Sequence, residues 1–122
     1  MLPRKYRLPA KEFQNLYKSG FKAKGKFGML ISRKNNLARP LFGFVVSKKI
    51  GNSVYRHRMT RLLRAISMEA VKHFQMENMG ISFSFVSFEF CNEYNVLKDE
   101  IFGLVEKTLS NELYEKNNSL VN

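Results

Sequence analysis

Several features that define other protein classes are scarce or missing in this sequence. It contains a single cysteine, Cys91, so no disulfide can form within the chain. No apolar run approaches the roughly 18–20 residues needed to cross a bilayer. The start of the chain is basic but lacks the apolar segment of a signal peptide. We therefore expect neither a disulfide-stabilised scaffold nor a membrane protein, and the cytoplasm is the expected location.

Acidic residues are nearly absent from the first 72 positions. This part holds 18 of the 21 lysines and arginines but only Glu12 and Glu69, a net charge of +16. Residues 73–122 carry three lysines and eight acids, a net charge of −5. A chain polarised in this way has one side suited to a polyanion, with nucleic acid the leading partner class and an anionic membrane surface the second.

The groups that would make this chain a nuclease by itself are also missing. No cluster of Asp or Glu suits two-metal chemistry, and no nucleophile stands beside a base. Cys91 has no partners at metal-ligand spacing, so no metal site is predicted. Three acids of the last predicted helix are expected on its solvated face: Asp99, Glu100 and Glu106. The residues alone predict a protein that binds RNA or DNA and does not cut it.

One stretch nearly matches a phosphate-binding loop. "GFKAKGKF", residues 20–27, has the glycine and lysine spacing of that motif, but Phe27 stands where Ser or Thr would hold Mg²⁺. We interpret it instead as a flexible basic loop that contacts phosphates through three lysines: Lys22, Lys24 and Lys26.

Hydrophobic patterns predict helices and strands in the order α-β-β-(β)-α-β-α. A short helix is predicted at residues 9–20, strands at 26–34, 41–49 and 81–90, and a long helix from Asn52 or Ser53 to about Glu77. A last helix follows, with one apolar face formed by Leu97, Ile101, Leu104, Val105 and Leu109. Because the link between the first two strands is short, we expect them to form an antiparallel pair. The prediction is a single-domain α+β sandwich over residues 1–122, with about 1–8 and 115–122 flexible.

The basic stretch "SKKIGNSVYRHRMTRLLRAI", residues 47–66, predicts a helix with two opposed faces. At about 100° per residue, an apolar stripe forms on one side. It consists of Met59, Leu62, Leu63, Ile66, Ala70 and Phe74. His57, Arg61 and Arg64 fall on the opposite side, with Arg56 and Arg58 beside them. The apolar face can pack on a sheet while the arginines stay free to bind.

Three other interpretations of this stretch fit less well. Solvated helix faces usually mix charges, but no acid lies between Lys48 and Arg64. A membrane-surface helix needs free apolar groups, whereas this stripe is needed for the core. A helix-turn-helix needs a second helix a short turn away, but strand-like sequence lies before and after this helix.

The aromatic residues of the basic part can stack on bases or pack in the core. They are Phe13, Tyr17, Phe27, Phe42 and Phe44, of which Phe13 and Tyr17 are placed to border a groove.

The stretch "VSKKIGNSVYRHRMTRLLRAI" closely resembles the signature of the protein subunit of bacterial ribonuclease P, roughly SKKxGxAxxRNRxKRxxR. The segments "LPRKYRLPAKEFQNLYKSG" and "LFGFVVSKK" resemble that family's first helix and the strand before its signature. Among the departures from the pattern, His57 stands where Asn is usual, and Thr60 stands where Lys is usual. Leu30 is expected at a cleft position that is often aromatic.

This resemblance implies a fold and a function. The fold is a ribosomal protein S5 domain 2-like sandwich with a left-handed βαβ crossover. The function is that of an endoribonuclease subunit without catalytic residues of its own, which joins a catalytic RNA to remove the 5′ leader of precursor tRNA. Mg²⁺ in the holoenzyme is held mainly by RNA, with no cofactor on the protein alone and no obligate protein partner. The alternative is a non-enzymatic RNA-binding protein, such as a ribosomal protein.

The resemblance also implies two groups of site residues. Phe13 and Tyr17 correspond to a cleft that holds the single-stranded leader. The signature residues contact the catalytic RNA, and in this sequence they are Lys48, Lys49, Gly51, Asn52, Arg56, His57, Arg58, Arg61 and Arg64.

Overall fold

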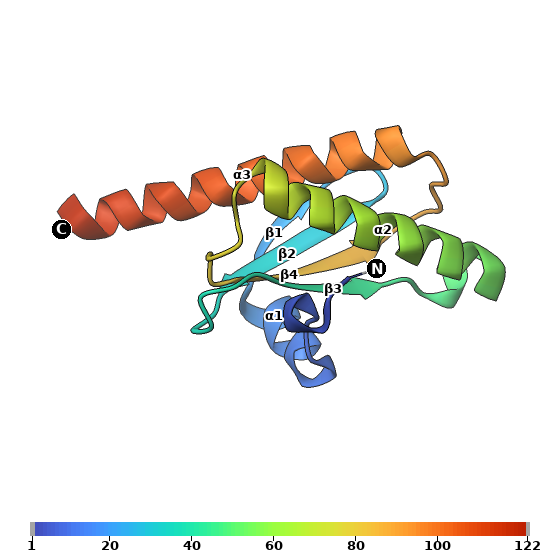
Figure 1. Cartoon of the computed structure of the whole chain (residues 1–122), viewed down its shortest axis with the longest axis horizontal. Helices are drawn as coiled ribbons and strands as arrows, with labels where there is room; N and C mark the ends of the chain where they lie inside the picture. The colour runs from blue at the N-terminus through green and yellow to red at the C-terminus, as the bar shows by residue number, and fades with distance from the viewer. Residues whose placement is uncertain (1, 122) are drawn as a thin grey trace.

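The computed structural model contains one four-stranded sheet with helices on both faces (Figure 1). It describes the backbone of residues 2–121 and the side chains of residues 2–111. The elements are α1 (Phe13–Ser19), β1 (Phe21–Lys24), β2 (Gly28–Lys34), β3 (Leu41–Val45), α2 (Ser53–His73), β4 (Ile81–Ser87) and α3 (Tyr94–Val121). Short 3₁₀ turns lie at Arg4–Tyr6, Ala10–Glu12 and Lys48–Ile50. The predicted α+β class and element order are confirmed, with β1 as the additional short strand.

The sheet has the strand order β1-β2-β4-β3. β4 pairs antiparallel with β2 and parallel with β3, so it lies between them. The predicted pairing of β2 with β3 is therefore wrong, although the two strands do run in opposite directions. The link of residues 35–40 is long enough to pass over one intervening strand, since neighbouring strands are only about 4.8 Å apart.

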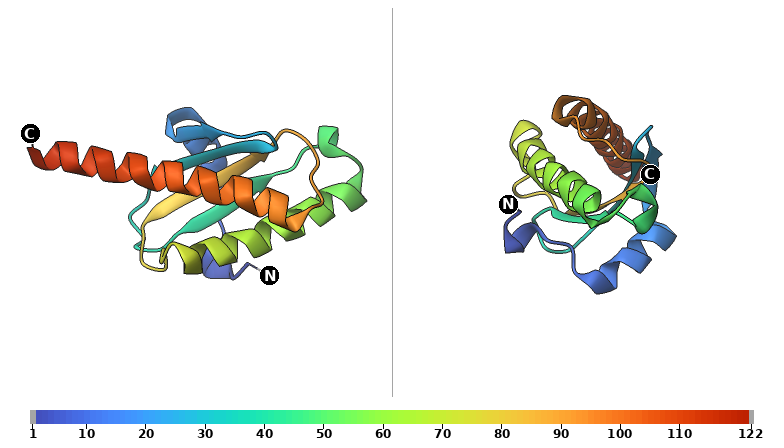
Figure 2. Two further views of the ribbon diagram at one scale, coloured as in Figure 1. Left: turned by 90° about the horizontal axis from the view of Figure 1, so that it is seen from above. Right: turned by 90° about the vertical axis from the view of Figure 1, so that its right-hand side faces the viewer.

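The connection from β3 through α2 to β4 has the less common hand. In Figure 2 (right), the C-terminal ends of β3 and β4 point toward the reader. Seen this way, the chain leaves β3, rises to α2 on the face of the sheet that the two long helices cover, and then descends to β4, which lies between β3 and β2. This path is left-handed, as the resemblance implies, whereas most such crossovers are right-handed.

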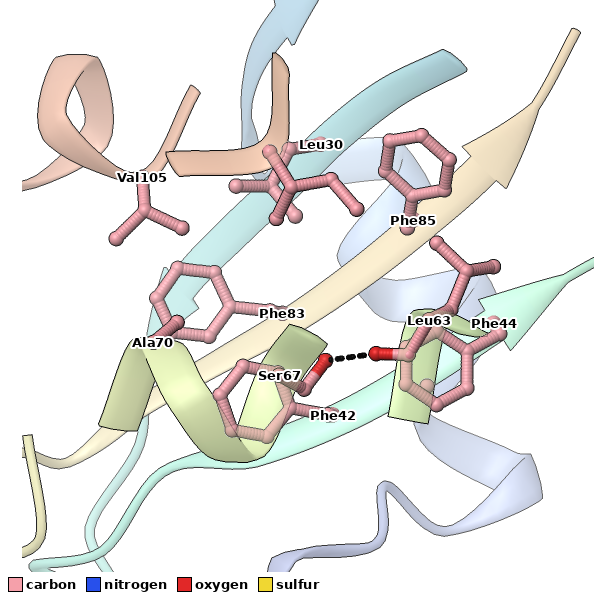
Figure 3. A pocket seen from close by; sticks show the side chains of 11 residues that line it. Leu30, Phe42, Phe44, Leu63, Ser67, Ala70, Phe83, Phe85 and Val105 are labelled. Atoms are coloured by element: carbon pink, nitrogen blue, oxygen red, sulfur yellow. Dashed lines mark hydrogen bonds between the residues drawn. The ribbon is translucent and has the colours of Figure 1, made fainter. Parts of the chain in front are cut away.

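Side chains along each strand alternate between the two faces of the sheet. Helices cover both faces (Figure 1), so each face contributes to a core cluster. One face carries Leu30, Phe42, Phe83 and Phe85 against α2 and α3, and these residues belong to the larger core cluster. Figure 3 shows them around a space of about 10 Å³, which holds at most one water molecule. The opposite face packs against α1 through a smaller cluster of Leu8, Leu16, Met29, Ile31 and Leu41. The nearly continuous apolar runs of the strands reflect this double coverage.

Helix α2 begins and ends at defined caps. The Asn52 side chain accepts hydrogen bonds from the backbone N–H groups of Val54 and Tyr55 at 3.0 and 3.2 Å, as predicted for its N-cap. The helix ends at His73, earlier than predicted. Gln75 adopts a left-handed φ of 53°, and the N–H of Met76 donates to the carbonyl of Val71 at 2.9 Å, which closes the helix in a Schellman arrangement. Glutamine is an uncommon residue at this position, so the sequence pattern does not reveal the stop.

The N-terminal segment packs against the sheet over residues 2–8. Leu2, Tyr6 and Leu8 are buried, and the Leu8 N–H donates to the carbonyl of Phe42 on the edge strand β3 at 2.9 Å. Three apolar side chains gain burial by covering the edge. The expected flexibility of residues 1–8 stays a prediction. The expected flexibility of residues 115–122 lies outside the residues whose side chains are described.

The segment predicted as a flexible basic loop is a hairpin tied to α3. Residues 21–24 pair with β2, and the turn that follows donates two backbone N–H groups to the Glu100 carboxylate. The distances are 2.6 Å from Lys26 N and 2.9 Å from Phe27 N. Glu100 was expected on a solvated face, but it serves as the acceptor that holds the hairpin turn against α3.

A polar cluster joins α2 to α3. The Tyr94 hydroxyl donates to Glu69 at 2.5 Å, and Lys98 pairs with the same carboxylate at 2.8 Å. Hydrogen bonding from Lys98 and Tyr94 holds the pKa of Glu69 below its ordinary value. Burial and the Glu69 hydrogen bond raise the pKa of Tyr94 to about 12. The cluster is therefore intact around neutral pH.

We expect Tyr94 to make stability fall with alkaline pH. Its pKa is about 10 in the unfolded chain and about 12 in the folded one. Its contribution is then complete below pH 10 and is lost as the pH rises toward 12, because the unfolded chain releases the proton first. Urea midpoints of the wild type should fall more steeply between pH 9.5 and about 11.5 than those of Tyr94→Phe. Parallel curves for the two proteins would contradict this assignment.

Candidate RNA interface

From Ser53 to Arg64, the exposed face of α2 carries basic side chains and no acidic residue. His57, Arg58, Arg61 and Arg64 are exposed, whereas Met59, Leu63 and Ile66 on the opposite side are 0% exposed. Within the described side chains, no arginine of α2 is paired with a carboxylate. The predicted division of this helix into a core face and a free face is confirmed. Unpaired guanidinium groups at this density suit phosphate oxygens, which they can bind in pairs of hydrogen bonds.

The entry to α2 extends this cationic face. Lys48 and Lys49 are exposed in a 3₁₀ turn that buries Ile50. Gly51 follows with a φ of 148°, and a Cβ there would lie 3.1 Å from the Cβ of Tyr55. A side chain at position 51 would be strained, which explains the glycine. Asn52 caps the helix, so its side-chain oxygen is already engaged; its contribution to the interface is to set where the helix starts.

A groove lies on the opposite face of the sheet, between α1 and the strands. It encloses about 360 Å³ and is lined by Phe13, Gln14, Tyr17, Ile31, Val45, Ser84 and Val86. Tyr17 is 56% exposed. The structure thus brings Phe13 and Tyr17 together in one largely apolar groove, as the helix spacing suggested. Aromatic faces in such a groove can stack on unpaired bases. We call it the aromatic groove.

Gly43 of β3 allows Phe13 to approach the sheet. A Cβ at position 43 would lie 2.3 Å from the Phe13 ring, far inside van der Waals contact. The ring therefore packs directly over the β3 backbone, which fixes one wall of the aromatic groove.

Lys22 adds a charge to this groove that the sequence pattern did not assign to it. Its ammonium lies 5.0 Å from the centre of the Tyr17 ring, within cation–π range. Antiparallel pairing of β1 with β2 brings this strand beside α1, and pairing of this kind is not visible in a four-residue segment. The aromatic groove thus combines stacking surfaces with a cation.

Comparison with known proteins identifies the family of this chain. A profile of the family described as Ribonuclease P matches residues 2–97. The chain belongs to the ribonuclease P protein family. One relative, the ribonuclease P protein component of Micrococcus luteus, is 32% identical over 123 residues, which cover 89% of this chain and 92% of the relative.

Other ribonuclease P relatives match over shorter segments. The protein component of Fusobacterium nucleatum is 43% identical over 53 residues, or 43% of this chain and 48% of that protein. The component of Syntrophomonas wolfei is 39% identical over 70 residues, or 57% of this chain and 59% of that protein. The matched part of the chain therefore spans about half the length of these relatives.

Solved ribonuclease P proteins share the fold. The protein from Thermotoga maritima superimposes with a TM-score of 0.71 at 18% identity, over 83% of this chain and 96% of that one. A mutant protein from Staphylococcus aureus gives a TM-score of 0.69 at 19% identity, over 86% and 89% of the two chains. At such identities the likeness establishes the common fold, and the roles of individual residues rest on this chain's own geometry.

His57 and Thr60, which depart from the ribonuclease P signature, both lie on α2. His57 is exposed among the arginines, where a neutral or protonated imidazole can donate to a phosphate. The Thr60 hydroxyl donates to the carbonyl of Arg56 at 2.8 Å, so it replaces a cation by a local hydrogen bond.

Leu30 lies in the core under α2 and α3, where only 3% of it is exposed, while its neighbour Ile31 lines the aromatic groove. The expectation that Leu30 faces the cleft is therefore wrong, because adjacent strand residues point to opposite faces.

Two further properties concern what the chain itself can hold. Among the described residues, no group of three or more His, Cys, Asp or Glu side chains is arranged to bind a metal ion. No helix in the described part of the chain is long and apolar enough to cross a membrane.

Proposed function

We propose that this chain is the protein subunit of a ribonuclease P ribonucleoprotein. It binds a catalytic RNA through the cationic face of α2 and its entry turn. It also takes the unpaired 5′ leader of precursor tRNA into the aromatic groove, and so assists endonucleolytic removal of the leader. The RNA, with Mg²⁺ held mainly by its own phosphates, carries out the chemistry.

The single observation that supports this proposal is that one sheet carries a basic helix face on one side and an aromatic groove on the other. The face of α2 offers charge without aromatic side chains, which suits the backbone of a structured RNA. The aromatic groove offers Phe13 and Tyr17 with one nearby cation, which suits unpaired bases. A protein that binds one folded RNA needs the first surface alone, whereas a subunit that presents a strand to an RNA catalyst needs both.

Reconstitution tests this function directly. The full chain, mixed with a bacterial ribonuclease P RNA and a precursor tRNA at low Mg²⁺, should stimulate cleavage at the 5′ end of the mature tRNA. Absence of stimulation, with RNA binding retained, would favour a non-enzymatic RNA-binding protein. Cleavage by the chain without added RNA would contradict the assignment of chemistry to the RNA.

We expect Tyr17→Ala to weaken leader binding by about 5- to 150-fold, since stacking of one base contributes about 1–3 kcal/mol. The side chain is mostly exposed, so the fold should be unaffected. The measurement is the affinity of the reconstituted holoenzyme for precursor tRNA with and without a 5′ leader. Phe88→Ala is the matched control, because Phe88 is an aromatic residue 40% exposed that does not line the groove. Equal affinities for Tyr17→Ala and the control would remove the leader from this groove.

A further inference from the structure

The arginines of α2 form two rows rather than one surface. Arg56 and Arg64 line a hollow of about 240 Å³ between α2 and the end of β3, together with Val46, Ser53, His57 and Thr60. Arg58 and Arg61 do not line it, because at about 100° per residue they lie farther round the helix. The signature therefore presents an inner row, Arg56 and Arg64, and an outer row, Arg58 and Arg61.

A second hollow continues the first toward the N-terminal segment. It has a volume of about 260 Å³ and shares Thr60 and Arg64 with the first. Its other walls are Leu2, Arg7, Leu8, Phe42 and Phe44. Because they share these residues, the two hollows lie next to each other along α2, between Ser53 and Arg7. We call them together the α2 channel.

The α2 channel is cationic and has an unused donor. It holds Arg7, Arg56, Arg64 and His57, and none of its lining residues is acidic. The Nε of Arg56 is buried without a hydrogen-bond partner within the described side chains. A buried donor of a charged group costs free energy when it has no acceptor, so a bound anion would satisfy it. Arg7 uses its Nε to bind the carbonyl of Leu2 at 3.1 Å, which leaves its other N–H donors available.

The α2 channel and the aromatic groove meet at the end of the edge strand β3. Val45 lines the groove and Val46 lines the channel, on opposite faces of the sheet. The N-terminal segment pairs with β3 at Phe42, before this point. A flexible strand lying in the groove can therefore pass around the end of β3 and enter the channel.

We propose that the α2 channel binds the phosphate backbone of the same unpaired RNA strand whose bases occupy the aromatic groove. Arg7, Arg56 and Arg64 then hold the substrate strand, and Arg58 and Arg61 hold the catalytic RNA. This proposal rests on the proposed function. It assigns a binding role to Arg7, which lies outside the signature, and it divides the signature arginines between two RNAs.

The test compares two double variants that remove the same charge. Arg7→Gln with Arg64→Gln alters the channel, and Arg58→Gln with Arg61→Gln alters the outer row. All four residues are exposed, so both variants should fold. The full-length proteins are titrated with a fluorescent, unstructured oligoribonucleotide and, separately, with a ribonuclease P RNA.

The channel variant should lose at least about tenfold more affinity for the oligoribonucleotide than the outer-row variant, and the order should reverse for the catalytic RNA. Arg56→Lys keeps the charge but lacks the buried Nε, and it should weaken oligoribonucleotide binding alone. Equal losses for the two double variants, or a channel variant that loses only the catalytic RNA, would overturn the division. Wild-type reconstitution separates the two proposals: failed stimulation of 5′ cleavage refutes the proposed function, whereas normal stimulation with equal losses refutes the channel alone.

Discussion

Replacing Arg58 and Arg61 together by glutamate is expected to weaken binding of a ribonuclease P RNA by about 100-fold or more. Both side chains are exposed on α2 and neither has a carboxylate partner among the described side chains. Each charge-assisted contact with a phosphate contributes about 1.5–3 kcal/mol, and the introduced carboxylates add repulsion. The dependence of log K on log salt should also become less steep by about two, because two fewer counterions are released.

The measurement is a titration of labelled RNA with protein at several salt concentrations. Lys72→Glu with Lys107→Glu is the control, because it changes the net charge equally at exposed positions outside the arginine rows. Circular dichroism should show unchanged helix content in both variants. If the control loses as much affinity as the arginine variant, binding follows net charge alone and α2 is not the interface.

Replacing Phe83 by alanine is expected to lower the free energy of unfolding by about 3–5 kcal/mol. The side chain is 1% exposed, and its ring stacks on Phe42 with centres 5.2 Å apart and planes 11° apart. It lies on the central strand, beneath both long helices, so no neighbouring group can fill the space without moving a helix (Figure 3). This loss is a large fraction of the about 5–15 kcal/mol that stabilises most domains.

Urea denaturation of the two proteins gives this difference. Phe88→Ala serves as the comparison, because Phe88 follows the same strand but is 40% exposed, and its loss should cost little. A similar small loss for both variants would mean that the layer between the sheet and the helices is loosely packed. Because α2 rests on this layer, Phe83→Ala should also weaken RNA binding at temperatures where the variant is partly unfolded.

The elements with strong periodicity could be predicted from the sequence. The faces of α2 follow from a spacing of about 100° per residue, and the N-cap follows from Asn52, so both required only local information. The groove residues Phe13 and Tyr17 follow in the same way, because residues four apart share one face of a helix. In each case the relevant contacts lie within a few positions of one another along the chain.

The features that the sequence did not reveal depend on residues far apart in the chain. The position of β4 between β2 and β3 is set by the crossover through α2, which no strand pattern records. The anchoring of the hairpin turn by Glu100 joins positions 73 residues apart. The burial of Leu2 and Tyr6 depends on an open edge strand that only the assembled sheet creates. Arg7 and Lys22 also reach the candidate site through pairing that only the assembled sheet creates: Arg7 lies beside Phe42 of β3, and Lys22 lies on β1, which pairs with β2.

The central position of β4 has a consequence for how the chain acquires its structure during synthesis. β4 is the last strand to leave the ribosome, yet it is the only strand of the sheet beside β3, and it pairs with β2 along the whole length of that strand. A nascent chain that ends before Ile81 therefore carries every arginine of the protein without a sheet to display them on. We therefore expect the two proposed RNA-binding surfaces to form together, once residues 81–87 have inserted between β2 and β3.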